Sequence, residues 1–322
     1  SYPVVEYAFQ HPLTLEVALG SQLRERQRQV HAMVANSIES QDTARLEENA
    51  ALLAQHWEGA GELLNAAHWH RRAAEWVGLT DFAAANLHWQ RVRQLARELP
   101  NDKAAATLGI AACTRLLGLS LSANIGLEQA RSMLEEGQNR ANPIGDSRAH
   151  LALSQAYGFA LNSAGDMVAY LQLTRENLQA ALEIDDTGIQ ASASMYLVDA
   201  LGHAGRLRET LEVAEDGLER FPRNLPTEER NGGINPYSMF SFWRGYCLVW
   251  LGRRPEGLKE FARCRELANE DGSLEIVGYA LVLAAEAHCY GNEAEEAKMC
   301  ARLCEENSSR LKDPANMIAC RQ

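Results

Sequence analysis

The 322-residue sequence has no hydrophobic run long enough to cross a membrane and no positively charged start followed by an apolar core. Few of its segments alternate apolar and polar residues as β-strands do, and its nine prolines lie between the apolar-periodic segments instead of within them. These absences argue against a membrane protein and against a β-rich fold. They predict an almost wholly helical, cytoplasmic chain.

The sequence motifs that commonly carry catalysis are also missing. We find no GxxxxGK[ST] phosphate loop, no HExxH, no GxSxG and no GxGxxG after a strand. Carboxylates are numerous, but they occupy helix positions that are expected to face solvent. We therefore predict no catalytic residue, no metal and no cofactor, and interpret the chain as a non-enzymatic module.

The charge and the cysteines exclude further classes of protein. With a net charge of −12, the chain lacks the concentrated basic surface that nucleic-acid binding requires. Its seven cysteines are an odd number scattered over helical segments, without a CxxC pair, which predicts reduced thiols in the core. A metal shared by Cys300 and Cys304 with His288 or Cys289 is the weaker alternative.

Apolar residues recur at the helical period from Leu46 onward, and glycines separate successive segments. Four of these turn glycines, Gly165, Gly205, Gly252 and Gly291, are 40, 47 and 39 residues apart. We expect a left-handed backbone at each of them to end one helix and let the next turn back. Because the strict tetratricopeptide repeat has a period of about 34 residues, the sequence predicts longer, tetratricopeptide-like hairpins.

The clearest hairpin is predicted at residues 233–268, where two helices flank a Leu-Gly-Arg-Arg-Pro turn. Gly245 and Gly257 stand where the two helices have to approach closely. Gly257, Phe261 and Cys264 share one face of the second helix.

Stacked hairpins of this kind place their first helices along a concave groove. Counting back from the turn glycines puts aromatic, methionine and polar side chains on that side, which suits a bound peptide or protein segment. The same side chains could instead fill the space between neighbouring repeats. The predicted groove residues are Gln155, Phe159, Asn162, Met195, Asp199, Met239, Phe242 and Tyr246.

Histidine and tryptophan are concentrated between His56 and Trp89. His68 and His70 are two residues apart, so on a helix they point to different faces and cannot hold one metal together. We predict that these amphipathic rings seal the junction between repeats.

Several stretches resemble one known family more specifically. Residues 7–18, YAFQHPLTLEVA, followed by Leu23-Arg24-Glu25-Arg26 and His31, resemble the end of the winged-helix segment in signalling ATPases of the STAND class. Leu19 departs from the usual tyrosine. LAQHWE at 53–58 and RRAAE at 71–75 resemble the first repeat of those proteins, and segments 235–237, 244–245 and 250–253 resemble a later one.

These stretches occur together in bacterial class III adenylate/guanylate cyclases that carry an ATPase module and a tetratricopeptide tail. Related kinases and LuxR-type regulators share some of them. The resemblance implies a sensor and regulatory arm that binds a protein, a peptide or a small inducer, or the ATPase and effector domains of its own polypeptide. The chain contains neither a cyclase domain nor an ATP-binding loop, so neither activity is assigned to it.

We therefore predict an all-α, right-handed superhelical solenoid of about five to six hairpins. Residues 1–42 are expected to be the end of a winged-helix and linker segment, and residues 43–322 the repeat domain. The start at Ser1 suggests a piece of a longer polypeptide. The alternatives are a constitutive scaffold or oligomerisation module without a ligand, and an enzyme hidden in the groove.

Overall fold

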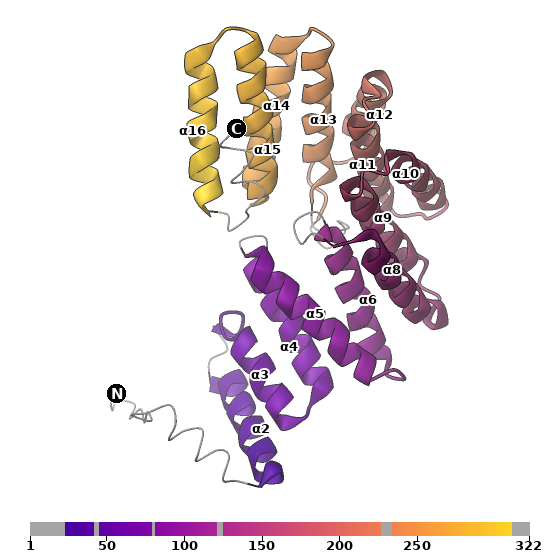
Figure 1. The fold of residues 1–322 in the computed structure, drawn as a ribbon, viewed down its shortest axis with the longest axis vertical. Helices are drawn as coiled ribbons and strands as arrows, with labels where there is room; N and C mark the ends of the chain where they lie inside the picture. Colours follow the sequence, from indigo (N-terminus) through magenta and orange to yellow (C-terminus); the bar gives the residue numbers. More distant parts are fainter. Residues whose placement is uncertain (1–22, 42–44, 79–80, 121–124, 227–233, 311–322) are drawn as a thin grey trace.

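The computed structural model describes residues 23–41, 45–78, 81–120, 125–226 and 234–310 (Figure 1). All regular structure in these ranges is helical, as predicted. Of the segment 1–42 that was predicted as winged helix and linker, residues 1–22 and 42 lie outside the described ranges. None of the helices in this part of the chain combines the length and apolarity needed to span a bilayer. The α-helices are α2 (Arg24–Gln41), α3 (Ala50–Ala60), α4 (Leu63–Val77), α5 (Phe82–Glu98), α6 (Lys103–Gly118), α8 (Leu127–Ala141), α9 (Ser147–Ser163), α10 (Met167–Leu182), α11 (Thr187–His203), α12 (Leu207–Arg220), α13 (Pro236–Trp250), α14 (Arg254–Glu270), α15 (Leu274–Tyr290) and α16 (Ala294–Arg310).

The helices form a curved array in which each packs against the next (Figure 1). The fourteen helices are enough for seven hairpins, more than predicted, because α2 also joins the array by packing against α3. From α9 onward, the first helices α9, α11, α13 and α15 also contact one another. The second helices α10, α12, α14 and α16 make no comparable contacts among themselves within the described residues. The first helices therefore form the inner layer.

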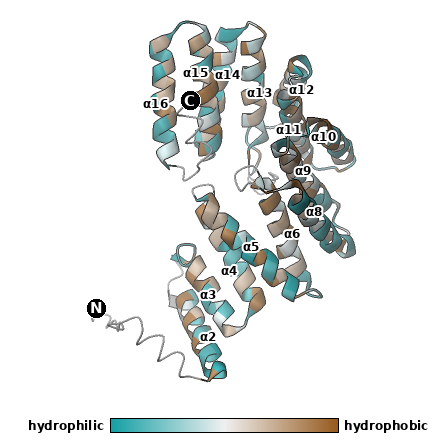
Figure 2. Ribbon diagram, viewed as in Figure 1, coloured by the Kyte–Doolittle hydropathy of each residue, from teal (hydrophilic) through white to brown (hydrophobic). Residues whose placement is uncertain are grey.

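The inner layer is the more apolar one, as Figure 2 shows for much of its length. Every residue of α11 from Ala191 to Gly202 is buried, so no side of this helix faces solvent along that stretch. The second helices keep a polar outer face, which is the expected pattern for the outside of a helical repeat array.

Aspartates start many of the helices. The side chains of Asp81, Asp102, Asp146, Asp166 and Asp186 each accept a hydrogen bond from the backbone N–H three residues further on, at 2.9–3.1 Å. Each aspartate thus satisfies a backbone donor that the first turn leaves unpaired.

Three of the four predicted turn glycines have the expected left-handed backbone, with φ of 75° at Gly165, 70° at Gly205 and 83° at Gly252. The prediction is wrong for Gly291, whose φ is −88°, and Asn292 takes the left-handed position instead with φ of 56°. A Cβ on residue 291 would meet only the guanidinium of Arg254, the end of a flexible side chain that can move aside, so neither the backbone nor the space demands glycine there.

The close approach predicted within the 233–268 hairpin is confirmed. A Cβ on Gly245 would lie 2.9 Å from the Phe261 ring, and one on Gly257 would lie 2.7 Å from the carbonyl oxygen of Gly245. Phe261 and Cys264 are both buried in the C-terminal core cluster, on the shared face that the spacing predicted.

Candidate functional site

A row of half-buried side chains on α13 forms the centre of the candidate site. Met239, Phe242 and Tyr246 follow one another at helical spacing and contact two core clusters, one on α11–α13 and one on α14–α16. The helix starts at Asn235, whose side-chain oxygen accepts from the N–H of Tyr237 at 3.0 Å and whose Nδ2 donates to Asp271 at 2.7 Å. The row therefore lies on a helix that is fixed at its first turn.

Aromatic rings continue this row along α13 and onto α15. We call four residues the aromatic row: Trp243, Tyr246, Trp250 and Tyr290. The centroids of successive rings in this row are 5.4, 6.1 and 5.5 Å apart. Exposure rises along it, from 5% at Trp243 to 50% at Trp250 and 63% at Tyr290. The row thus runs from the core to the surface.

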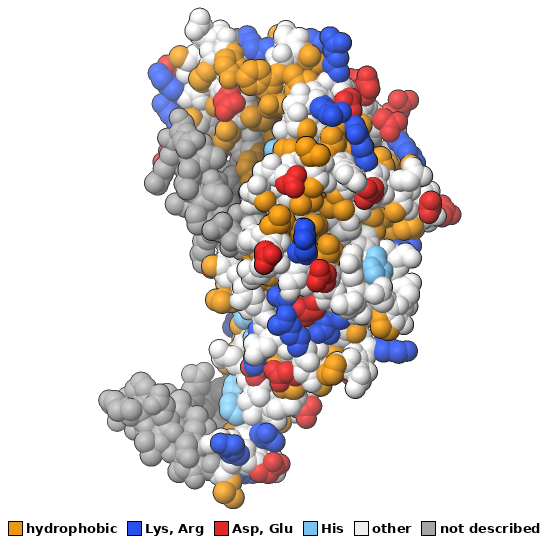
Figure 3. Space-filling model, turned by 45° about the vertical axis from the view of Figure 1, so that its right-hand side comes forward, with side chains coloured by type: hydrophobic (Ala, Val, Ile, Leu, Met, Phe, Trp, Pro, Cys, Tyr) orange, Lys and Arg blue, Asp and Glu red, His pale blue; other side chains and the backbone are white. Residues whose placement is uncertain are grey.

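The exposed end of the aromatic row borders a shallow pocket. Leu283 and Glu286 of α15 line this pocket together with Tyr246, Trp250 and Tyr290. Figure 3 shows hydrophobic side chains at the upper end of the molecule, the end at which α13 and α15 terminate in Figure 1. Sequence reasoning missed Trp250 and Tyr290, although Trp250 lies four residues after Tyr246 and so on the same face of α13.

Asp199 lies beneath the aromatic row, with 8% of its surface exposed. It accepts from the Tyr170 hydroxyl at 2.8 Å, and His203 Nδ1 donates to its backbone oxygen at 3.0 Å and approaches its carboxylate at 3.3 Å. The His203 ring in turn meets the Trp243 ring edge-on at 5.1 Å. Asp199 therefore connects α10 and α11 to the aromatic row.

The environment of Asp199 shifts the pKa values of both its partners. Burial would lower the pKa of His203, but the hydrogen bond to Asp199 and the charge of that carboxylate together raise it. Burial first, and then the charge of Asp199, raises the pKa of Tyr170 well above its usual range. Both shifts favour the protonated forms of His203 and Tyr170, which are the forms that donate to Asp199.

The remaining predicted groove residues come from α9 and α11. Phe159 is half-buried and meets the buried Tyr196 ring at 5.3 Å, next to Met195, which is 3% exposed. Gln155 is 1% exposed, and Asn162 is half-buried. The structure thus brings Phe159, Met195, Met239, Phe242 and Tyr246 into contact with one cluster, while Gln155 and Asn162 flank Phe159 on α9.

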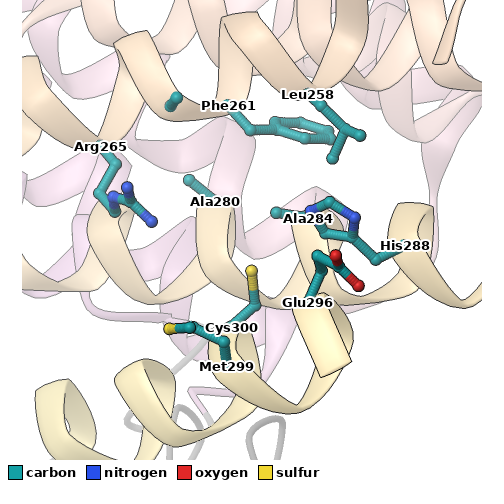
Figure 4. Close-up of a pocket in the computed structure, with 10 residues that line it drawn as sticks. Leu258, Phe261, Arg265, Ala280, Ala284, His288, Glu296, Met299 and Cys300 are labelled. Atoms are coloured by element: carbon teal, nitrogen blue, oxygen red, sulfur yellow. The ribbon is translucent and has the colours of Figure 1, made fainter. Parts of the chain in front are cut away.

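A larger pocket, of about 260 Å³, opens between the second helices α14 and α16, with α15 as its floor (Figure 4). Leu258, Phe261, Ala284 and Met299 are among its apolar walls. Figure 4 shows Arg265 on one side of this pocket and His288 with Glu296 on the other. Two of its lining residues, His288 and Cys300, are among the possible metal ligands named from the sequence.

The histidine and tryptophan cluster is structural. Trp57 and Trp69 both donate through Nε1 to one oxygen of Glu39, at 2.7 and 2.8 Å, and Trp57, Trp69 and Trp89 are buried in the largest core cluster. This confirms the prediction for those rings, whereas Trp76 is 55% exposed. In the described ranges no group of three or more potential ligands is placed to hold a metal ion.

Among known proteins, no family model and no curated sequence matches this chain. Solved structures do match. A Rap protein complexed with Competence and Sporulation Factor superposes with a TM-score of 0.58 and 13% identity, covering 92% of this chain and 79% of the Rap chain. A STAND protein with a tetratricopeptide repeat sensor, from Pyrococcus horikoshii, gives a TM-score of 0.48 and 10% identity, covering 85% of this chain and 48% of that one. The likeness to Rap, itself a tetratricopeptide protein, shows that the fold is a tetratricopeptide-like helical repeat.

Proposed function

We propose that the chain is a ligand-sensing interaction module that binds a peptide or protein segment along α13. The observation that carries this proposal is the aromatic row, with its half-buried neighbours Met239 and Phe242. Large apolar side chains that stay partly exposed between two core clusters offer area to a partner at little cost in side-chain ordering. Aromatic residues and methionine are also the types enriched where proteins bind one another.

The shared fold supports a bound segment as the ligand. The Rap protein that this chain resembles in fold was solved in complex with Competence and Sporulation Factor. An array of this architecture thus has room for a signalling partner. Five of the predicted groove residues are exposed enough to touch such a partner directly: Phe159, Asn162, Met239, Phe242 and Tyr246. The other three are buried and would act only by supporting their neighbours: Gln155, Met195 and Asp199.

The sequence motifs supply the wider context of the proposal. The stretches that resemble STAND signalling ATPases favour a regulatory arm, in which ligand binding shifts an attached ATPase between resting and active forms. The ligand could change the free-energy difference between the resting and the active form by no more than the difference between its binding free energies for the two forms. The link to nucleotide cyclases stays a prediction, which the complete reading frame of the gene tests by the presence or absence of a cyclase domain.

A selection experiment tests the ligand-binding role. Random peptides displayed on phage are selected on the immobilised chain, and the enriched peptides are then synthesised and titrated by calorimetry. We expect Phe242→Ala and Tyr246→Ala to weaken their binding by roughly tenfold or more, as for residues at the centre of an interface. Val168→Ala, on α10 and 81% exposed, is the matched control that leaves binding unchanged.

Two outcomes would contradict the proposal. Peptides that bind both variants as tightly as the parent chain would place the site elsewhere. A chain that enriches no peptide but self-associates in sedimentation experiments would favour the scaffold or oligomerisation module. Thermal unfolding of each variant, followed by circular dichroism, shows whether lost binding reflects a lost fold.

A further inference from the structure

The exposed end of the aromatic row has the shape of a corner. The Trp250 and Tyr290 rings lie 5.5 Å apart with their planes 60° apart, and Tyr246 closes the inner side with its ring centroid 6.1 Å from that of Trp250. Three rings from two helices therefore border one shallow pocket, and two of them are half exposed or more. We call this arrangement the ring corner. A group that enters this pocket would therefore contact aromatic rings.

A carboxylate without a basic partner borders the same pocket. Among the described residues, Glu286 makes no ion pair, and its charge is near enough to Tyr246 to help raise the pKa of that phenol, behind the larger effect of burial. The cations in this region are already engaged: Arg253 pairs with Glu256, Arg254 with Glu293, and Arg244 with Glu215 and Glu260. The ring corner thus carries an uncompensated negative charge.

We propose that the ring corner binds a cationic side chain, lysine or arginine, of the partner segment. This inference rests on the proposed function, because it takes the cation from a peptide bound along α13. A cation over aromatic faces gains from the ring quadrupoles, and the carboxylate of Glu286 adds direct attraction. An acidic side chain would meet like charge, and a purely apolar one would remove Glu286 from water without giving it a partner.

Small probes test the ring corner separately from the groove. Choline and 3,3-dimethylbutan-1-ol have nearly the same shape, but only choline is charged. Each is titrated into the chain with 15N-labelled tryptophan, and the indole signal of Trp250 is assigned through its loss in Trp250→Leu. We expect choline to shift that signal with an affinity about two- to fivefold higher than that of the neutral alcohol, the ratio expected for one exposed cation–π contact.

Variants and a control complete the test. Glu286→Gln keeps the shape of the pocket and is expected to weaken choline binding several-fold, with a smaller change for the alcohol. The indole signal of Trp76, an equally exposed tryptophan on α4, stays in place. Equal shifts by choline and alcohol, or no shift at Trp250, would overturn the inference.

The two proposals can fail separately. Selected peptides that depend on Phe242 but show no preference for lysine or arginine over norleucine would remove the cationic specificity and leave the ligand-binding role intact. If choline binds at Trp250 but the chain selects no peptide, the ring corner binds cations and the proposed peptide-binding role is wrong.

Discussion

One buried carboxylate of the inner layer, Asp199 on α11, interacts with side chains from two helices. The Tyr170 side chain is completely buried and donates its hydroxyl to Asp199, which also interacts with His203. When a buried carboxylate loses one of its hydrogen-bond donors, the free-energy penalty for its desolvation remains without compensation. Single hydrogen bonds at this position therefore matter more than their average value suggests.

Removing the Tyr170 hydroxyl tests this. We expect Tyr170→Phe to lower the free energy of unfolding by about 1–3 kcal/mol, because one Asp199 oxygen loses its donor. Urea unfolding followed by circular dichroism measures the change. Tyr290→Phe removes an exposed hydroxyl and should stay within about 0.5 kcal/mol of the parent. Equal losses in both variants would show that the buried bond adds nothing.

At the same scale, the sequence indicated only part of the candidate site. The spacing of Met239, Phe242 and Tyr246 placed them correctly on one face of α13. It could not show that Met195 and Asp199 are covered, because the burial of α11 depends on side chains from α13. Trp243, for example, fits against Gly202 of α11, 41 positions earlier in the chain. Such pairings depend on how hairpins stack, which periodicity within one helix does not encode.

Close contacts between elements explain several glycines inside helices. A Cβ at Gly202 would fall within the Trp243 ring, so α11 and α13 approach each other only because residue 202 has no side chain. We expect Gly202→Ala to cost about 1–3 kcal/mol by overpacking and to shift the fluorescence of the displaced indole. Gly118, at the end of α6, has open space around it. The control Gly118→Ala should therefore be neutral or slightly stabilising, and a harmless Gly202→Ala would contradict the packing.

Histidine pairs link neighbouring elements near the N-terminal end. His31 and His56 approach through Nδ1 atoms 3.0 Å apart, joining α2 to α3, and His70 and His88 do so at 2.8 Å, joining α4 to α5. Burial lowers the pKa of His70 and His88, although the hydrogen bond from His70 to Glu58 opposes the shift. Burial and the charge of His31 lower the pKa of His56.

These shifts predict a pH-sensitive stability for α2–α5. A histidine whose pKa is lower in the folded chain binds fewer protons there than in the unfolded chain, so stability rises with pH across that interval. As the pH falls below about 6.5, the pKa of histidine in the unfolded chain, the free energy of unfolding of these helices should decrease. The decrease should stop once the pH is below the lower pKa values of the folded chain. Hydrogen exchange at pH 7.5 and 5.5, corrected for intrinsic rates, should show protection falling several-fold in residues 24–98.

The paired histidines can be replaced without removing their polar contacts. The double variant His56→Asn/His88→Asn keeps a polar group near each Nδ1 position but does not titrate. Because His68 and His70 remain and burial lowers the pKa of both, its protection should still fall on acidification, but clearly less than that of the parent chain. If the variant loses as much protection as the parent chain, the pH effect comes from other groups. Glu58 titrates at lower pH than these histidines, because mainly its hydrogen bond with Arg91 lowers its pKa.

For the whole molecule, the separate core clusters matter most. One large cluster extends from α2 to α11, and another occupies α14–α16, with α13 between them. In repeat arrays of this kind, stability is approximately a sum of local terms between neighbours. Damage at one end should therefore spread only a short way along the chain.

Leu281 of α15 tests this locality, since it is 2% exposed within the C-terminal cluster. We expect Leu281→Ala to lower the local stability by about 2–5 kcal/mol, seen as faster hydrogen exchange from α13 to α16. Exchange in α4–α8 should stay at parent rates. Uniform acceleration along the chain would show a single cooperative unit instead.

The overall fold was the most predictable level, because every hairpin repeats the same signals. Helical periodicity and the turn glycines indicated the helical hairpins, as for the hairpin predicted at 233–268, whose two helices are α13 and α14. The exception at Gly291 arose because asparagine also tolerates a left-handed backbone, and Asn292 takes that position. The spacing of the glycines does not show which of the two residues does so.

The left-handed turn at Gly252 has a stereochemical consequence. Its φ of 83° is unfavourable for an L-residue but lies where a D-residue is most stable, and the position is exposed. D-alanine at 252 should therefore stabilise the chain by about 0.4–1 kcal/mol by restricting the unfolded state, whereas L-alanine should destabilise it. Ligation at Cys247, five residues earlier, gives chemical access to both isomers, so thermal unfolding can compare mirror-image methyl groups at one turn.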